Sequence, residues 1–341
     1  MSGRELVDPE LLWLVDLIGE IRLDADSLPE LRAQFEEMTA SVPPPEVPGL
    51  TITDRRIPGP DGAPEVRVVV YEPKRSGSAP TPALLWIHGG GYVIGSPTAA
   101  NRMVHFFVAE LGWPIVSVDY RLAPETPFPG PLEDCHAALS WMTTHADELG
   151  VDPSRFGVVG ESAGGGLAAS LALLARDRGD VSLAHQLLVY PMLDDRTVDD
   201  PAPSPFQGEL IWTRAANRFA WTAYLGAEPG RGDVSPHAAA ARAEDLSGLP
   251  PAFVSVGSID LFCDEDIEYA RRMARAGVPT ELHVYPGAPH SFVGAIGMAR
   301  AADDHLRDAV AALRAALAPA GAALARDAGR AHGERFVQRA R

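Results

Sequence analysis

Residues 160–164 of this chain read Gly-Glu-Ser-Ala-Gly and place Ser162 between two glycines. An apolar run at 155–160 precedes them and predicts a buried strand, and a run rich in alanine and leucine follows and predicts a helix. A sharp turn between strand and helix lifts a serine out of the sheet, and glycines flank it because larger side chains would collide. The amides and dipole at the helix start favour negative charge near the hydroxyl. The stretch therefore predicts a nucleophilic serine.

Two other interpretations of this stretch compete with that one. A flexible glycine loop is the simpler alternative, so the nucleophile needs support from the rest of the chain. Residues 164–169 also fit a dinucleotide-binding fingerprint, Gly-x-Gly-x-x-Ala. That fingerprint opens directly off its strand, whereas here the strand ends near Gly160 and the serine turn intervenes. Its position therefore argues against a nucleotide site.

A serine nucleophile needs a base, and the base needs an acid that orients it. Such groups converge at the carboxyl ends of the strands in a parallel sheet. Among ten histidines, His290 stands in the loop after the last expected strand, where it can reach the serine turn. His88 ends a strand, and His283 lies inside one. We expect the others to be surface or boundary residues: His105, His136, His145, His185, His237, His305 and His332.

Two positions between Ser162 and His290 offer the acid. Asp260 follows the strand just before the one that delivers His290, and we favour it. The alternatives are Asp194 and Asp195, which open an irregular segment and could instead serve turns or caps. Three further carboxylates follow in a row, Asp264, Glu265 and Asp266. This run is typical of the acidic first turn of a helix. No histidine is spaced to join them, so we expect no metal site.

Acyl transfer also needs hydrogen-bond donors for the oxyanion that develops in the transition state. Gly89, Gly90 and Gly91 follow an apolar strand and offer backbone N–H groups with no side chains in the way. The amide of Ala163, directly after the serine, offers another, and a glycine-run loop paired with this residue is a known arrangement. The place of the glycines after a buried strand argues against a merely flexible turn.

Apolar strands alternate with helices around these residues. We expect strands at 51–57, 65–72, 83–88, 114–119, 155–160, 186–191, 252–257 and 280–285. We expect helices at 5–22, 27–39, 101–111, 131–149, 165–174, 264–276 and 299–317. This alternation predicts an α/β fold with roughly eight strands in a mostly parallel sheet, helices on both faces, and an antiparallel pair at its start.

The chain divides into four parts on this interpretation. Residues 49–192 and 249–317 form the sheet-containing catalytic domain. Residues 193–248 break the alternation, and so long a connection is usually functional. With the N-terminal helices of residues 1–48, we expect this insertion to form a cap over the carboxyl edge of the sheet. Residues 318–341, rich in alanine and arginine, are expected to be a solvated tail, with an oligomer contact as the alternative.

Composition narrows the class of protein and its partners. The 341 residues include 29 basic and 46 acidic side chains, and a net charge of −17 argues against nucleic acid and anionic membranes as partners. No apolar run approaches the roughly 20 residues of a membrane span, and the N-terminus does not resemble a signal peptide. We therefore expect a cytoplasmic protein. The two cysteines, Cys135 and Cys263, are expected to be buried free thiols.

Four stretches together resemble the bacterial hormone-sensitive-lipase family (family IV) of esterases, within the α/β-hydrolases. They are His-Gly-Gly-Gly-Tyr at 88–92, Asp-Tyr-Arg-Leu-Ala-Pro-Glu at 119–125, Gly-Glu-Ser-Ala-Gly-Gly at 160–165, and the loops of Asp260 and His290. The resemblance covers about residues 40–317. It implies an α/β-hydrolase fold with a helical cap, Ser162 as nucleophile, Asp260 as acid and His290 as base. The implied oxyanion hole has these donors: Gly90, Gly91 and Ala163, with Gly89 less favoured.

The chain departs from the family pattern at three places. Glu161 stands where the family commonly has Asp or Thr, and Leu261-Phe262-Cys263 replaces Pro-Leu-Arg. The usual His-Gly-Phe becomes His-Ser-Phe at 290–292. No departure removes a member of the triad. We interpret His88 and Glu161 as supporting residues of their motifs, and the segment 119–125 as structural support for the His88 loop.

The resemblance implies a serine carboxylesterase that hydrolyses short- to medium-chain acyl esters through an acyl-enzyme and needs no cofactor. An amidase, lactonase or deacetylase could use the same triad. A non-catalytic small-molecule binding protein on this fold would be expected to lack a triad member. We expect a small-molecule ester as substrate, with a homodimer as a candidate assembly. The candidate lining of the substrate pocket is Trp86, Tyr92, Phe206, Trp212 and Trp221.

Overall fold

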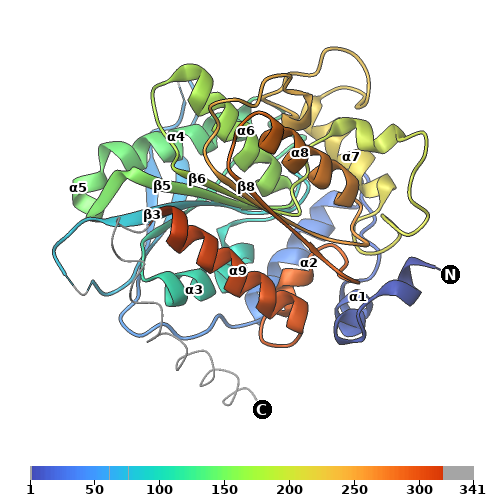
Figure 1. The fold of residues 1–341 in the computed structure, drawn as a ribbon, viewed down its shortest axis with the longest axis horizontal. Coiled ribbons are helices and arrows are strands. Elements are labelled where there is room, and N and C mark those ends of the chain that lie inside the picture. Colours follow the sequence, from blue (N-terminus) through green and yellow to red (C-terminus); the bar gives the residue numbers. More distant parts are fainter. Residues whose placement is uncertain (1, 61, 76, 318–341) are drawn as a thin grey trace.

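The computed structural model describes residues 2–60, 62–75 and 77–317. One eight-stranded sheet runs through these residues, in the order β1-β2-β4-β3-β5-β6-β7-β8 (Figure 1). The strands are β1 Thr51–Ile57, β2 Val66–Glu72, β3 Thr81–Ile87, β4 Ile115–Asp119, β5 Val151–Glu161, β6 His185–Val189, β7 Ala252–Gly257 and β8 Thr280–Tyr285. Strand β2 is antiparallel to both β1 and β4, and the strands from β4 to β8 pair in parallel. The expected sheet, with an antiparallel pair at its start, is confirmed.

The apolar strands are explained by burial on both faces of the sheet. In β7, Phe253 packs into one buried cluster and Val254 into the other, because successive side chains point to opposite faces. Helices α3 (Pro97–Leu111) and α9 (Arg300–Leu317) cover one face, and α4 (Gly130–Thr144), α6 (Ala163–Arg178) and α8 (Cys263–Arg275) cover the other (Figure 1). Parallel sheets are stable when both faces are covered in this way.

The N-terminal helices differ from the expectation. The predicted helix at 5–22 is replaced by two short 3-10 helices, Gly3–Leu6 and Pro9–Leu11, and by α1, Leu12–Ile18. Proline interrupts helical hydrogen bonding at Pro9, and Gly19 ends α1 with a φ of 65°. Helix α2, Leu28–Ser41, matches the second expected helix. Helix α5, Ala146–Leu149, is a separate turn at the end of the helix expected at 131–149.

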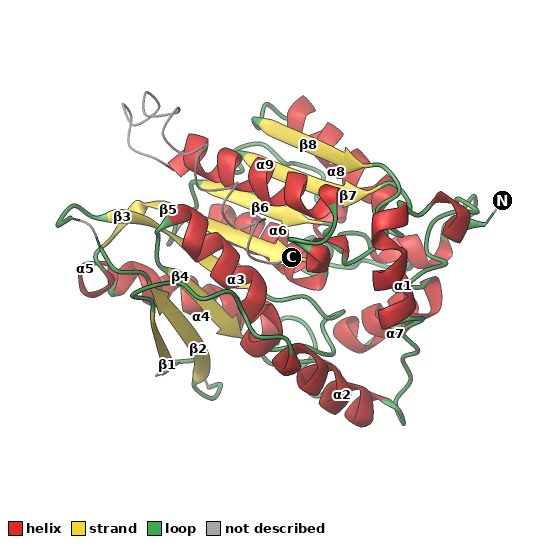
Figure 2. Cartoon of the chain, turned by 90° about the horizontal axis from the view of Figure 1, so that it is seen from below, coloured by secondary structure: helices red, strands yellow, loops and turns green. Residues whose placement is uncertain are grey.

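The insertion between β6 and β7 holds little regular structure. It contains 3-10 helices at Asp195–Asp199 and Ala240–Arg242, and helix α7, Arg214–Leu225. Figure 2 shows α1 and α7 at the end of the sheet toward which β6, β7 and β8 point. Both segments therefore lie at the edge of the sheet where loops after the parallel strands converge.

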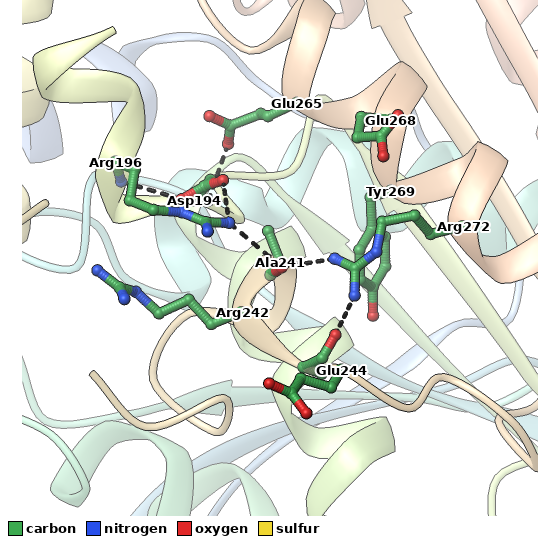
Figure 3. Close-up of a pocket in the computed structure, with 10 residues that line it drawn as sticks. Asp194, Arg196, Ala241, Arg242, Glu244, Glu265, Glu268, Tyr269 and Arg272 are labelled. Carbon is green, nitrogen blue, oxygen red and sulfur yellow. Dashed lines mark hydrogen bonds and ion pairs between the residues drawn. The ribbon is translucent and has the colours of Figure 1, made fainter. Parts of the chain in front are cut away.

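The first and last turns of α8 hold two distant parts of this insertion. The three acidic residues of the first turn are in the predicted place, but Glu265 is buried and accepts hydrogen bonds from the amides of Leu193 (2.7 Å) and Asp194 (3.2 Å). Arg272, also on α8, donates to the Ala241 carbonyl at 2.6 Å. Figure 3 shows these groups around a cavity of about 390 Å³. Because its guanidinium groups already have protein partners, this cavity is part of the packing between α8 and the insertion.

Two further observations concern the expectations on membranes and the tail. None of the helices within residues 2–317 that the structure describes is both long and apolar enough to cross a bilayer. The predicted tail at 318–341 lies outside the described residues.

Candidate active site

Ser162 lies at the turn between β5 and α6, as predicted. Its backbone has φ 57° and ψ −122°, a conformation that non-glycine residues rarely adopt and that costs about 1–3 kcal/mol. Its amide donates to the Val189 carbonyl at 2.9 Å, and its own carbonyl accepts from Gly166 and Met192 at 3.0 Å each. A Cβ on Gly160 would lie 2.1 Å from the Gly164 carbonyl oxygen, so glycine is required there. The surrounding structure therefore holds the strained turn in place.

A hydrogen-bonded chain links the three residues chosen from the sequence. Ser162 Oγ lies 2.9 Å from His290 Nε2, and His290 Nδ1 lies 2.8 Å from Asp260 Oδ2. All three side chains are buried. An ionised carboxylate only accepts, so Nδ1 carries the proton and Nε2 is free to accept from the hydroxyl. The geometry fits a Ser-His-Asp triad.

Asp260 is itself held in position by its loop. Its second oxygen, Oδ1, accepts a hydrogen bond from the Phe262 amide at 3.0 Å. The alternative acids have other partners: Asp194 caps a 3-10 helix through the Arg196 amide, and Asp195 binds Arg242 at 2.6 Å. Neither of these two contacts His290. Among the described residues, no group of three His, Cys, Asp or Glu side chains is arranged to hold a metal ion.

Aromatic rings surround the imidazole of His290. The Tyr190 ring centroid lies 4.7 Å from it, that of Phe262 5.3 Å and that of Trp212 6.2 Å. Behind the loop, Arg102 on α3 donates to the carbonyls of Gly294 and Ile296 at 3.1 Å each. These contacts fix both the ring and the loop that carries it.

The glycine loop after β3 has the shape that only glycines allow. Gly90 has φ 117°, and a Cβ there would lie 2.1 Å from the Ile94 carbonyl oxygen. Gly91 has φ 59°, and a Cβ there would lie 2.3 Å from Cη2 of Trp212. The loop therefore comes close to the insertion and leaves its backbone accessible beside Ser162.

The segment 119–125 supports this loop, as the sequence predicted. The hydroxyl of Tyr120 donates to the His88 carbonyl at 2.9 Å, and the two rings stack at 4.2 Å. His88 Nδ1 lies 2.8 Å from the Gly89 carbonyl, so this nitrogen carries the proton. Burial lowers the pKa of His88, which keeps the ring neutral. The loop is thus fixed by hydrogen bonds on its far side.

A cavity of about 120 Å³ opens onto the Ser162 hydroxyl. Its lining combines the glycine loop, the triad and a few side chains from outside the sheet: Ile21, Phe35, His88, Gly89, Gly90, Gly91, Ile94, Ala99, Ala100, Glu161, Ser162, Tyr190, Trp212, His290 and Ser291. Of the five aromatic residues that we expected to line the pocket, Trp212 is the one in this set. The other four do not line this cavity.

Their positions explain why. Trp86 lies within β3 and packs against Phe107 of α3 at 5.1 Å. Tyr92 and Trp221 are fully buried against each other at 5.4 Å. Phe206 lies beside the N-terminal segment, with its carbonyl oxygen 2.8 Å from the place of a Cβ on Gly3.

Sequence reasoning missed seven residues of the lining: Ile21, Phe35, Ile94, Ala99, Ala100, Tyr190 and Ser291. Tyr190 directly follows β6, so the rule that placed the triad could have found it. Ile21 and Phe35 come from the N-terminal segment, and no local signal shows which side of a helix faces a cavity. The expectation for four histidines was also wrong, because they are buried: His105, His136, His185 and His305.

The comparisons with known proteins agree with this geometry. The family model described as the alpha/beta hydrolase fold matches residues 84–294, more than half of the chain. Esterase LipI of Mycobacterium tuberculosis is 34% identical over 314 residues, which cover 91% of this chain and 95% of that protein. Carboxylesterase NlhH of the same species is 35% identical over 320 residues, with coverage of 92% and 98%.

A solved structure titled "Bacterial Heroin Esterase" has a TM-score of 0.84 and 39% identity, and covers 93% of this chain and 100% of its own. The fold, the sequence motifs and the relatives all indicate the same family. The chain is therefore a member of the alpha/beta hydrolase fold family and, within it, of the esterases related to hormone-sensitive lipase.

Proposed function

We propose that this protein is a serine carboxylesterase that hydrolyses short- to medium-chain esters through an acyl-enzyme. The observation that carries the proposal is the hydrogen-bonded chain from Ser162 through His290 to Asp260, with lengths of 2.9 and 2.8 Å. In this assignment Ser162 is the nucleophile, His290 the base and Asp260 the acid.

The chemistry follows from these positions. Ser162 Oγ attacks the ester carbonyl carbon while His290 Nε2 takes the hydroxyl proton. Asp260 stabilises the imidazolium that forms and keeps the ring in its orientation. His290 then gives the proton to the departing alcohol oxygen, and the ester bond breaks to leave an acyl-serine. Water repeats the sequence with the acyl-serine, releases the carboxylic acid and restores the hydroxyl.

The amides of Gly90, Gly91 and Ala163 are the proposed donors for the oxyanion, and Gly89 is less favoured. Within the described part of the chain these three amides have no hydrogen-bond acceptor, so they are free for a substrate oxygen. The positive φ angles of Gly90 and Gly91 turn the loop beside Ser162, and Ala163 begins α6. Removal of one such donor typically costs about 3–4 kcal/mol of transition-state stabilisation.

The preference for small acyl groups is supported by the size of the cavity, about 120 Å³. The proposed cap combines residues 1–48, which supply Ile21 and Phe35, with residues 193–248, which supply Trp212. Side chains from both segments would limit the length of the acyl chain. The sheet-containing parts, residues 49–192 and 249–317, carry the triad.

Location and assembly stay predictions. A cytoplasmic protein is supported by Cys135 and Cys263, which are buried free thiols and need no oxidising compartment. A homodimer is supported by β8, which is the last strand of the sheet that the described residues form and which exposes Leu282 and Val284.

The test compares the wild type with Ser162→Ala on nitrophenyl acetate, butyrate, octanoate and palmitate. We expect the shorter esters to be turned over and kcat to fall by about 10⁴ or more in the variant. Ser170→Ala is the matched control, because Ser170 is a buried serine on α6 whose hydroxyl has no hydrogen-bond partner in the described part of the chain. A matched amide substrate separates an esterase from an amidase. A Ser162→Ala protein that is folded and keeps a tenth of the activity contradicts the assignment.

A further inference from the structure

The catalytic cavity contains one acidic side chain that the triad does not use. Glu161 lines it directly beside Ser162, and the lining includes no lysine or arginine. Within the described residues, the hydrogen bond that Glu161 makes through its side chain is with the Tyr190 hydroxyl, which donates to Oε2 at 3.2 Å. The other oxygen, Oε1, therefore has no partner from the described protein.

The surroundings of Glu161 make its negative charge costly. Burial raises the pKa of its carboxyl, and the Tyr190 hydrogen bond and the nearby His290 oppose that rise only in part. His88 also lines the cavity, and its ring is neutral because burial lowers its pKa. A carboxylate in such a place is stabilised when a cation or a strong donor comes beside it. The described residues that line the cavity include no lysine or arginine, and the Tyr190 hydroxyl donates to Oε2 alone.

The position of the carboxyl fits a contact with bound substrate. A Cβ on Gly89 would lie 3.5 Å from Glu161 Cγ, so the side chain runs along the glycine loop. On its other side is Tyr190, whose ring packs against His290. An ester carbonyl placed at Ser162 Oγ would bring a neighbouring substituent of the substrate against this wall.

We propose that Glu161 forms an anionic subsite that selects esters carrying a cationic amine or ammonium group near the ester bond. The inference rests on the proposed esterase function and deepens it, because it names a class of substrate. Such a group would approach Oε1 and neutralise the carboxylate, whereas an anionic substituent would be rejected at the same place.

The charge of the whole protein acts in the same direction but over a longer range. A net charge of −17 attracts cations from solution, and this attraction weakens as ionic strength rises. Removal of one carboxylate changes that long-range field little. The local contact at Glu161, in contrast, is lost when its charge is lost, so one substitution separates the two effects.

The test uses two esters of the same shape, acetylcholine and 3,3-dimethylbutyl acetate, in which carbon replaces the charged nitrogen. The ratio of their kcat/KM values is measured at constant ionic strength for the wild type, Glu161→Gln and Glu37→Gln. Glu37 is the matched control, because it is exposed on α2 and does not line the cavity. We expect the preference for the cation to fall about tenfold in Glu161→Gln, which corresponds to about 1.4 kcal/mol, and to stay unchanged in Glu37→Gln.

The outcomes separate the subsite from the esterase activity. Hydrolysis of the neutral ester by the wild type tests the proposed function alone. If neither ester is hydrolysed, the subsite is tested by binding. Calorimetry then measures the dissociation constants of both esters for Ser162→Ala and for the double variant Ser162→Ala with Glu161→Gln. The ratio of the two constants is compared between these proteins. A preference that is the same with and without the carboxylate overturns the proposal. Equal losses for both esters also overturn it, and assign Glu161 to the positioning of Tyr190.

Discussion

Replacement of Asp260 by asparagine tests the reasoning about the triad most directly. The new side chain has nearly the same shape, and its oxygen can still accept from the Phe262 amide, which now binds Oδ1 at 3.0 Å. Its NH₂ group then faces His290 Nδ1, where Oδ2 now lies at 2.8 Å. Because an NH₂ group only donates, Nδ1 must become the acceptor and the ring proton moves to Nε2. That nitrogen can no longer accept the proton of Ser162.

The expected loss follows from this change of tautomer. The wrong tautomer in a Ser-His-Asp triad lowers kcat by about 10⁴, which corresponds to about 5.4 kcal/mol. The fold is expected to stay intact, since the substitution preserves the volume and one hydrogen bond. Hydrolysis of nitrophenyl butyrate, with circular dichroism as the check on folding, measures the effect.

Asp266→Asn provides the matched control. Asp266 is also fully buried, six residues further on in α8, and its carboxyl has no hydrogen-bond partner among the described residues. Burial raises the pKa of this carboxyl well above its usual range, which favours its neutral form, and asparagine is a neutral side chain of nearly the same volume. We expect this variant to keep its activity within a few-fold. Equal losses in the two variants, or a tenth of the activity left in Asp260→Asn, would refute the assignment.

Two further perturbations follow from burial. Burial lowers the pKa of His305 to about 3, so below its ordinary pKa of 6.5 the unfolded chain binds a proton that the folded one does not. The free energy of unfolding therefore falls by up to about 1.4 kcal/mol per pH unit as the pH drops below about 6, and urea titrations of His305→Leu should show a shallower slope. A variant with the wild-type slope would contradict this origin. Trp212→Ala should raise the octanoate-to-butyrate rate ratio several-fold, whereas Trp221→Ala should cost about 3–5 kcal/mol of stability and leave that ratio unchanged.

Much of the sheet and the triad could be predicted because each depends on a local pattern. The strand at 252–257 is an apolar run bounded by proline and glycine, and its predicted bounds agree with β7. His290 and Asp260 were found because residues that follow parallel strands meet at one edge. Pro9 and Gly19 also indicate the break of the N-terminal helix, whereas the apolar spacing of residues 5–22 favours one continuous helix.

The cavity walls could not be predicted in the same way. Trp86 and Trp212 are both large aromatic residues near motifs, but Trp86 packs against Phe107 of α3 and does not line the cavity. Phe35 reaches the cavity because α2 packs beside the glycine loop, where Arg32 donates to the Val93 carbonyl at 2.7 Å. Contacts of this kind join residues that are distant in sequence, so no local pattern reveals them.

The origin of the cavity walls has a consequence for how such enzymes evolve. Ser162, Asp260 and His290 follow strands of the sheet, whereas Ile21, Phe35 and Trp212 belong to segments outside it. A mutation in the outer segments can alter which molecules enter without moving a reacting atom. Selection can therefore change the substrate specificity of such an enzyme while its catalytic reaction stays the same.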